Sequence, residues 1–368
     1  MSAGALDGLV VADFSRVLAG PYATMMLGDL GARVIKIERP GGGDDTRAWG
    51  PPLDADGQAT YFNAVNRNKE SVVIDLGSDA GRAQALDLIA AADVVVENFR
   101  TGTMEKLGLG YDDARRVRPG IVYCSITGFG SGAGAALAGY DLLVQAVGGL
   151  MSVTGPDPSQ PTKVGVALVD VLTGLHALAG IQAALAHRAR TGEGQRVETD
   201  LLSTALSSLV NQASGFLGAG VVPAAMGNRH PSIAPYEVFS TADRPIVLAV
   251  GNDKQFAALT RVLGAPELAT DARFTDNTAR VAHREELFAL LTELLVRRSA
   301  DDWFALLNDA GVPAGPINDV AEALALGERL GLQPTVEIPG AAARQVANPI
   351  VLSATPVTYR SAPPRLPE

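Results

Sequence analysis

The sequence predicts an α/β protein with a large domain built on a parallel sheet and a second, smaller domain. First, 368 residues exceed the size of one ordinary hydrophobic core. Second, short apolar runs rich in β-branched residues alternate with helical patterns over the first 130 residues, as in parallel sheets with crossover helices. Third, Gly, Pro, Asn and His interrupt the pattern at 218–235, and we assign the smaller domain to residues 220–330.

The expected strands of the large domain are apolar runs without polar alternation, which favours a sheet covered on both faces. They span residues 9–14, 33–37, 72–75, 94–98, 121–126 and 196–199. Helices are expected at residues 22–30, 81–91 and 201–215. In the smaller domain we expect strands at 237–240 and 245–250 and helices at 253–263, 280–298 and 300–310. From residue 335 the tail is strand-like and then proline-rich, and we expect it to pack on a surface.

The composition limits the function and the compartment. A hydrophobic share of 47% with 19% charged residues is typical of a soluble globular enzyme. The net charge of −10 and the lack of a Lys/Arg run argue against a nucleic-acid partner. The single cysteine, Cys124, is expected to be buried in a strand, so no disulfide framework is predicted. The first residues lack the pattern of a signal peptide, which predicts a cytoplasmic protein.

A single carboxylate, Asp170, is the only group charged at neutral pH within the 23 residues 164–186. The pattern predicts a buried strand at 164–169 and a helix at 171–188, with Asp170 immediately before the helix. Asp170 is then either an N-cap or a reactive carboxylate that the helix end holds in the anionic form. The stretch is long enough to cross a membrane, but its central Asp and other polar residues favour a buried core element, so no membrane partner is expected.

Other motifs give weaker signals. The glycine-rich segment 128–134 does not match the dinucleotide-binding fingerprint, and we interpret it as a loop beside the active site. The four histidines are scattered without metal-ligand spacing, so no metal is expected. The sequence contains no G-x-S-x-G elbow of a serine hydrolase. Basic residues in loops at the edge of the expected sheet could together bind a phosphorylated ligand: Arg16, Arg39, Arg47, Lys69, Arg100 and Lys106.

Five long motifs carry a resemblance to a known family. They are VADFSRVLAGPYATMMLGDLGARVIKIERPGGGDDTRAWG (11–50), NRNKESVVIDL (66–76), DVVVENFRTGTMEKLGLGY (93–111), GYDLLVQAVGGLMSVTG (139–155) and GNRHPSIAPYEVF (227–239). They resemble the family III CoA-transferases, which include formyl-CoA transferase, carnitine CoA-transferase and the α-methylacyl-CoA racemases. The resemblance implies a large Rossmann-like domain of residues 1–219 completed by 331–368, a small α+β domain at 220–330, and an interlocked homodimer.

The resemblance also implies an acyl-CoA:carboxylate CoA-transferase with Asp170 as its nucleophile. Asp170 would attack the acyl-CoA thioester and form an aspartyl anhydride and CoA thiolate, which is a covalent relay. Because donor and acceptor differ only in which acid carries CoA, the exchange needs neither ATP nor metal. Coenzyme A or acyl-CoA is then a substrate, and no tightly bound cofactor is expected. The site must exclude water and stabilise oxyanions, typically with backbone N–H groups.

Two groups of residues match the family's site positions. The CoA-contacting positions are matched by Arg16, Arg39, Ile74, Asn98, Phe99 and Lys106. The acyl-site positions are matched by Leu18, Trp49, Tyr140, Asp141, Gly227 and Asn228. Leu18 stands where formyl-CoA transferase has a glutamine, so formyl or oxalate specificity is not implied. Gly227 and Asn228 fall near the family's mobile glycine-rich loop, which is not a glycine run here.

Three alternatives stay open. A racemase needs two acid/base groups at the α-carbon, and family racemases supply a histidine in a G-H-D motif. Here the motif reads Gly139-Tyr140-Asp141, and tyrosine, with a pKa of about 10, is a poor base at neutral pH. The others are a non-catalytic acyl-CoA-binding protein and a nicotinamide-dependent dehydrogenase. Arg47 could pair with a second carboxylate of a dicarboxylic acid, with CoA or within the fold. The family tail usually continues into an acidic helix beyond the position of Glu368.

Overall fold

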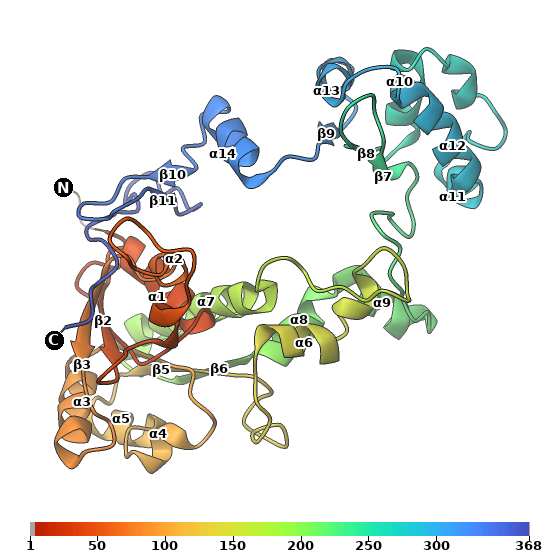
Figure 1. Cartoon of the computed structure of the whole chain (residues 1–368). Helices are drawn as coiled ribbons and strands as arrows, with labels where there is room; N and C mark the ends of the chain where they lie inside the picture. Colours follow the sequence, from red (N-terminus) through yellow and green to blue (C-terminus); the bar gives the residue numbers. More distant parts are fainter. Residues whose placement is uncertain (1–3, 368) are drawn as a thin grey trace. The chain divides into compact units, whose positions relative to one another are not determined.

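The computed structural model describes residues 4–367, which form two compact units (Figure 1). The first unit contains the residues up to 151, residues 163–222 and the residues from 331 onward. The second contains residues 152–162 and 223–330. The segment 152–162 therefore lies with the second unit, whereas the sequence-based boundary had kept it in the large domain. That residues 1–219, completed by 331–368, form the CoA-binding domain and residues 220–330 the small domain stays a prediction.

A parallel sheet of six strands lies at the centre of the first unit, in the order β3-β2-β1-β4-β5-β6. Its strands are β1 (Val10–Asp13), β2 (Arg33–Glu38), β3 (Lys69–Val73), β4 (Val94–Glu97), β5 (Val122–Thr127) and β6 (Arg196–Asp200). The predicted parallel sheet is confirmed. The largest difference from the expected strand bounds is in β3, which lies at the edge of the sheet. Its polar first residues pair with β2, although only its apolar end predicted a strand.

Helices cover both faces of this sheet, because successive side chains of a strand point to opposite sides. Val94 and Val96 of β4 pack in one core cluster, whereas Val95 packs in another. Helices α1 (Ala19–Asp29) and α7 (Leu168–Thr191) contribute to the first cluster, and α3 (Asp79–Ala91), α4 (Thr103–Lys106) and α5 (Tyr111–Val117) contribute to the second. The prediction of a sheet covered on both faces is confirmed, and Cys124 is buried with a free thiol, as expected.

Shorter elements complete the first unit. They are the 3₁₀ helix η1 (Asp45–Ala48) and the helices α2 (Thr60–Asn63), α6 (Asp141–Val147), α8 (Leu201–Ser208) and α9 (Val210–Ala219). A second 3₁₀ helix, η2 (Met151–Val153), crosses the boundary to the second unit. The single helix predicted at 201–215 is wrong, because Val210 takes a φ of 39° and separates α8 from α9.

Helix α7 differs from its prediction at its start. It begins at Leu168, and residues 164–167 form no strand, so the expected strand at 164–169 is wrong. Asp170 therefore lies inside the first turn of the helix. Among the described residues, α7 is the one helix long and apolar enough to cross a membrane. Its buried side chains recur at helical spacing and pack into the core against α1, as a core helix does: Thr173, Ala177, Ile181 and Ala184.

The C-terminal tail packs on the first unit. Strands β10 (Thr335–Val336) and β11 (Gln345–Val346) form an antiparallel hairpin, and the chain continues beyond it without further helices or strands up to residue 367. The Arg360 guanidinium donates hydrogen bonds to the carbonyl oxygens of Gly28, Gly31 and Ala32. These three carbonyls lie at the end of α1 and before β2, so the expected packing of the tail on a surface is confirmed.

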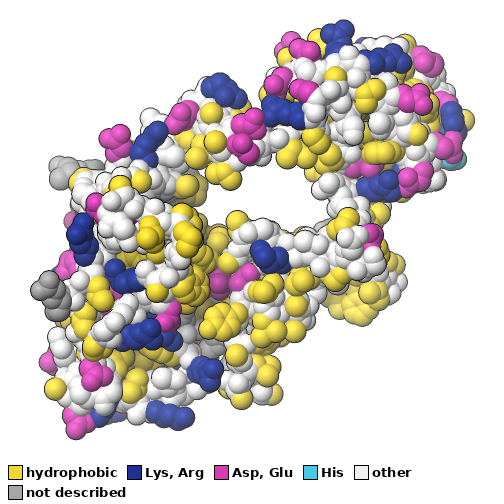
Figure 2. Space-filling model, viewed as in Figure 1, with side chains coloured by type: hydrophobic (Ala, Val, Ile, Leu, Met, Phe, Trp, Pro, Cys, Tyr) yellow, Lys and Arg dark blue, Asp and Glu magenta, His cyan; other side chains and the backbone are white. Residues whose placement is uncertain are grey.

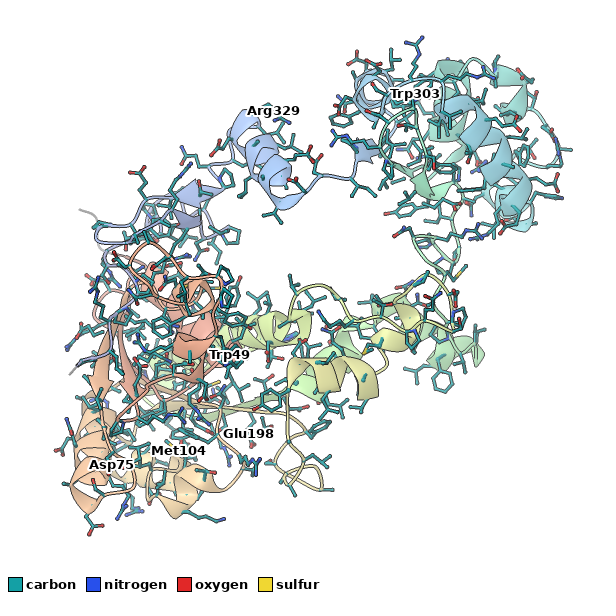
Figure 3. The ribbon with its side chains drawn as sticks, viewed as in Figure 1. Trp49, Asp75, Met104, Glu198, Trp303 and Arg329 are labelled. Carbon is teal, nitrogen blue, oxygen red and sulfur yellow. The ribbon has the colours of Figure 1, made fainter. Side chains whose placement is uncertain are left out.

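The second unit has its own antiparallel sheet and core. The sheet consists of β7 (Tyr236–Phe239), β8 (Ile246–Ala249) and β9 (Ala314–Pro316). Its helices are α10 (Asp253–Val262), η3 (Pro266–Ala269), α11 (Asn277–Ala282), α12 (Arg284–Leu295), α13 (Ala300–Asp309) and α14 (Val320–Arg329). The single helix predicted at 280–298 is wrong, because the chain turns at His283 between α11 and α12. Trp303, labelled in Figure 3, is buried in this core and donates to the carbonyl of Leu295.

Candidate active site

Loops at the carboxyl ends of the parallel strands line a pocket in the first unit, where open α/β sheets bind ligands. The loops after β1, β4 and β5 contribute to its wall, together with the first turn of α7. Glycines of segment 128–134 lie in this wall, which agrees with their interpretation as a loop beside the site. Seven of the side chains singled out from the sequence line the pocket: Arg16, Leu18, Asn98, Phe99, Arg100, Tyr140 and Asp170.

A second pocket adjoins the first, because the side chains of Arg16 and Phe99 line both. It is also lined by two further residues assigned to CoA contacts, Arg39 and Ile74. Asp75, labelled in Figure 3 at the end of β3, lies in its wall as well. A long ligand could therefore occupy the second pocket with one end and reach Asp170 in the first with the other.

The remaining candidate residues lie elsewhere. Lys106 is exposed on α4 and lines neither pocket. Trp49, labelled in Figure 3, is partly exposed, and its ring packs edge-on against Tyr61 of α2 with 5.2 Å between ring centroids. Gly227 and Asn228 line a pocket of the second unit instead, with Arg229 and Phe288 in its wall.

Asp141, a candidate acyl-site residue, caps helix α7. Its Oδ1 accepts the backbone N–H groups of Val169 at 2.8 Å and Asp170 at 3.2 Å. Gln145, one turn further along α6, donates to Asp141 Oδ2 at 2.6 Å and accepts the backbone N–H of Val164 at 2.9 Å. The first-turn N–H groups of α7 are thus satisfied by another helix, which is why Asp170 need not cap it. The N-cap interpretation of Asp170 is therefore wrong.

The protonation of Asp170 follows from this arrangement. Burial and, to a smaller extent, the negative charge of Asp141 together raise the pKa of Asp170 to about 7. The expectation that the helix end holds Asp170 in its anionic form is corrected, because those N–H groups bind Asp141 instead. Once ionised, a carboxylate with a raised pKa is a better base and nucleophile than an ordinary one.

Tyr61 is a candidate site residue that no sequence pattern indicated. It lies on α2, a helix of four residues, and burial raises the pKa of its phenol. The charges of Asp170 and Asp141 raise that pKa further, so Tyr61 lies within electrostatic reach of both carboxylates. The phenol therefore stays protonated at neutral pH. About a hundred residues separate Tyr61 from Asp170 in the chain, and no local spacing links them.

The loop after β1 is held in a strained conformation. Val17, which lines the first pocket, has a φ of 69°, and this left-handed conformation is unfavourable for a β-branched residue. The Asn98 side-chain amide binds this loop through two hydrogen bonds. Its Oδ1 accepts the Arg16 N–H at 2.8 Å, and its Nδ2 donates to the Arg16 carbonyl at 2.7 Å. Asp44 Oδ1 accepts the Val17 N–H at 3.3 Å, and Lys36 Nζ donates to the Ser15 carbonyl at 2.9 Å. The side chains of three other segments thus fix the loop.

Two of the basic residues singled out from the sequence are committed to the fold. The Arg47 guanidinium binds Glu38 through two hydrogen bonds of 2.7 and 2.6 Å and lies 3.8 Å from the centroid of the Phe62 ring. Lys69 is fully buried and binds Asp13 at 3.0 Å. Burial lowers the pKa of Lys69 to about 8 against the opposing effect of Asp13. The expectation that all six bind a ligand together is therefore corrected for Arg47 and Lys69.

In the part of the chain that the structure describes, no group of three or more His, Cys, Asp or Glu side chains could hold a metal ion. The Asp170 pocket is lined by this half-buried carboxylate, by Asp45 and by Arg16 and Arg100, and Arg39 lines the adjoining pocket. This set can perform nucleophilic chemistry on a bound ligand that carries negative charge at its other end.

Comparisons with known proteins agree with this arrangement. The family model described as CoA-transferase family III matches residues 6–368. A succinate–glutarate CoA-transferase of Agrobacterium fabrum is 45% identical over 99% of this chain and 93% of its own length. A succinyl-CoA:glutarate CoA-transferase of Mus musculus is 42% identical over 92% of this chain and 80% of its own.

A solved structure also matches the whole chain. The crystal structure of a CAIB/BAIF family protein from Brucella suis has a TM-score of 0.90 and 44% sequence identity, and it covers 100% of this chain and 97% of its own. Together with the family match, this similarity extends over both units. The chain therefore belongs to CoA-transferase family III, and it is a CoA-transferase.

Proposed function

We propose that this enzyme moves CoA between small dicarboxylic acids, with Asp170 as the covalent nucleophile. The observation that carries the proposal is the position of Asp170, whose carboxyl group lies half-buried in the pocket that Arg16 and Phe99 connect to the arginine-lined one. The acid class is supported by the names of the two relatives, both of which refer to glutarate. Succinyl-CoA and glutarate are therefore the first donor and acceptor to test.

The proposed relay balances without an external energy source. The Asp170 carboxylate attacks the thioester carbonyl, the C–S bond breaks, and a mixed anhydride and CoA thiolate result. The thiolate then attacks the aspartyl carbonyl, which releases the donor acid and leaves CoA as a thioester on Asp170. The acceptor carboxylate attacks that thioester, and CoA thiolate attacks the acyl carbonyl of the second anhydride. Acyl-CoA leaves, and the Asp170 carboxylate is restored.

The surrounding residues support each step physically. Asp141 fixes the start of α7 and hence the position of Asp170, through the two N–H groups that it accepts. Phe129 and Leu201 contribute apolar surface to the pocket, and such surface helps to keep water from a reactive anhydride. Arg16 and Arg39 would bind the phosphates of CoA, because guanidinium groups match phosphate oxygens in charge and geometry.

The racemase alternative finds less support. Among the described residues that line the Asp170 pocket there is no histidine, and Tyr140 is 65% exposed. The histidine that family racemases supply beside the Asp is therefore lacking within that wall. A racemase would exchange the α-proton of a 2-methylacyl-CoA with D₂O in the absence of an acceptor acid, and we expect no such exchange.

A covalent adduct tests the proposal. After incubation with succinyl-CoA, the intact mass of the protein should increase by an adduct that hydroxylamine removes, and peptide mapping should locate it on Asp170. Asp170→Asn should form no adduct and should lose at least about a thousandfold in the rate of CoA exchange to glutarate. Asp87→Asn, at an exposed position on α3, is the matched control and should react like the wild type. An adduct on Asp170→Asn, or exchange at the wild-type rate, would refute the relay.

We also propose that the enzyme acts as a homodimer. Large apolar side chains on α6, α8 and α9 are exposed to solvent, and Figure 2 shows hydrophobic groups gathered over this region. They include Leu142, Leu143, Val147, Leu206, Val210, Phe216 and Leu217. Soluble monomers rarely expose an apolar patch of this extent, so a second copy of the chain is proposed to cover it. Light scattering coupled to size-exclusion chromatography should give twice the mass of one chain.

A further inference from the structure

We propose that Asp45 occupies the phosphate-binding arginine pair of the empty enzyme and thereby weakens the binding of CoA. The proposal rests on the proposed function, in which Arg16 and Arg39 bind CoA phosphates. Its starting point is a bridge between the two arginines. Asp45 Oδ1 accepts from Arg39 at 2.6 Å, and Asp45 Oδ2 accepts from Arg16 at 3.2 Å. Each carboxylate oxygen thus serves a different guanidinium, as a phosphate group would.

The position of Asp45 is fixed by its neighbour. Asp44, the preceding residue, caps η1 by accepting the Thr46 N–H at 3.0 Å and is buried against Lys36 at 2.8 Å. Asp45 is the first residue of η1, so the buried Asp44–Lys36 pair holds it at the rim of the pocket. The Asp45 carboxylate therefore stays near the arginines after a ligand displaces it from them.

Arg16 has donor capacity that the empty enzyme does not use. Its Nε is buried and makes no hydrogen bond among the described residues, and its Nη1 donates to Asp45. The guanidinium lies 5.1 Å from the centroid of the Phe99 ring, which keeps it at the boundary between the two pockets. A phosphate, with more oxygens and more negative charge than a carboxylate, would satisfy more of these donors.

The expected effect is moderate. The side chains of Arg16, Asp45 and Arg39 are 37%, 35% and 56% exposed, so water and salt screen their interactions. Asp45 weakens binding in two ways: its ion pairs must break before a phosphate binds, and its charge then repels the bound phosphate. Removal of the charge should therefore tighten binding, which is the opposite of what loss of a contact residue would do.

The test measures CoA affinity by isothermal titration calorimetry. Asp45→Asn should lower the Kd for CoA roughly three- to tenfold at low salt, and the gain should shrink as salt is added. Asp45→Ser serves as a second variant with the same expectation, whereas Asp45→Glu keeps the charge and should stay close to the wild type. Glu193→Gln removes one negative charge at the opposite edge of the sheet and should not change the Kd. An unchanged or higher Kd in both neutral variants would overturn the proposal.

Truncated ligands identify the phosphate group. Pantetheine lacks all phosphates, and its Kd should not differ between wild type and Asp45→Asn. If 3′-dephospho-CoA retains the gain, the displaced carboxylate competes with the diphosphate; if the gain disappears, it competes with the 3′-phosphate. A gain with pantetheine would contradict the proposal, because no phosphate is then involved.

Two further variants separate this inference from the proposed function. Arg16→Ala and Arg39→Ala should each raise the Kd for CoA, since each removes a phosphate ligand. If they do so while the neutral Asp45 variants show no gain, the inference fails and the proposed binding site stands. If the arginine variants bind CoA like the wild type, both fail. Thermal unfolding of every variant confirms that affinities are compared between folded proteins.

Discussion

Two carboxylates of the same unit, Asp13 and Asp170, are both shielded from water, but their surroundings shift their pKa values in opposite directions. Asp13 ends β1 and is fully buried, yet Lys69 binds it at 3.0 Å and the Ser15 and Thr24 hydroxyls donate to it. Burial by itself would raise the pKa of Asp13, but Lys69, Lys36 and the two hydroxyls lower it below its ordinary value. For Asp170, burial and the nearby Asp141 charge raise the pKa to about 7.

The difference separates a structural from a reactive carboxylate. A charge with cations and hydroxyls around it is satisfied within the fold and has no capacity left for a ligand. Asp170 has no ion-pair partner among the residues that the structure describes, and it faces a pocket. The sequence alone could not distinguish the two, because the partners of Asp13 come from β3 and α1.

The largest effect on stability is expected where the satisfied carboxylate loses its cation. Lys69→Met leaves Asp13 buried without its main partner, which should lower the free energy of unfolding by about 3–5 kcal/mol. Urea unfolding at neutral pH measures it. Lys106→Met, at an exposed position on α4, is the control and should stay within about 0.5 kcal/mol of the wild type. If Lys69→Met were equally stable, the contrast between the two carboxylates would lose its physical basis.

A smaller effect is expected at Asp170, and its sign depends on pH. The folded-state pKa of Asp170, about 7, lies above the ordinary value of 3.8, so the folded protein binds this proton more tightly than the unfolded chain does. The group's stabilising contribution is full below pH 4 and is lost as the pH rises toward 7. Between pH 5 and pH 8, Asp170→Asn should therefore gain on the order of 2 kcal/mol of stability relative to the wild type. Asp87→Asn should show no such trend in the same denaturant series.

The reaction should depend on pH in the corresponding direction. Because the ionised form of Asp170 is the proposed nucleophile, kcat/KM should rise with pH up to about 7. Asp141→Asn keeps an oxygen for the N–H groups of Val169 and Asp170 but removes the negative charge. Its rising limb should shift to lower pH, while the limb of Asp87→Asn should not move. A shift to higher pH would mean that Asp141 does not act through its charge.

The parallel sheet was predictable because its signal is local: buried strands such as β4 read as continuous apolar runs. Short elements without periodicity were not, and α2 with Tyr61 is the example that matters for the site. The start of α7 was misjudged because its cap, Asp141, comes from α6, and sequence rules look for a cap on the helix itself. Interactions between distant segments likewise decide that Arg47 and Lys69 serve the fold.

The smallest effect is expected at Val17, in the loop between Asp13 and the Asp170 pocket. Asp13 ends β1, and Arg16, three residues later, already lines that pocket. Val17→Gly and Val17→Ala both remove the isopropyl group, but only glycine accepts a φ of 69° without strain. The glycine variant should therefore be more stable than the alanine variant by about 0.5–1 kcal/mol in urea unfolding. It should nevertheless have the higher KM for acyl-CoA, because a loop without strain also has more freedom beside Arg16. If stability and KM improved together, the strain at Val17 would have no part in ordering the pocket.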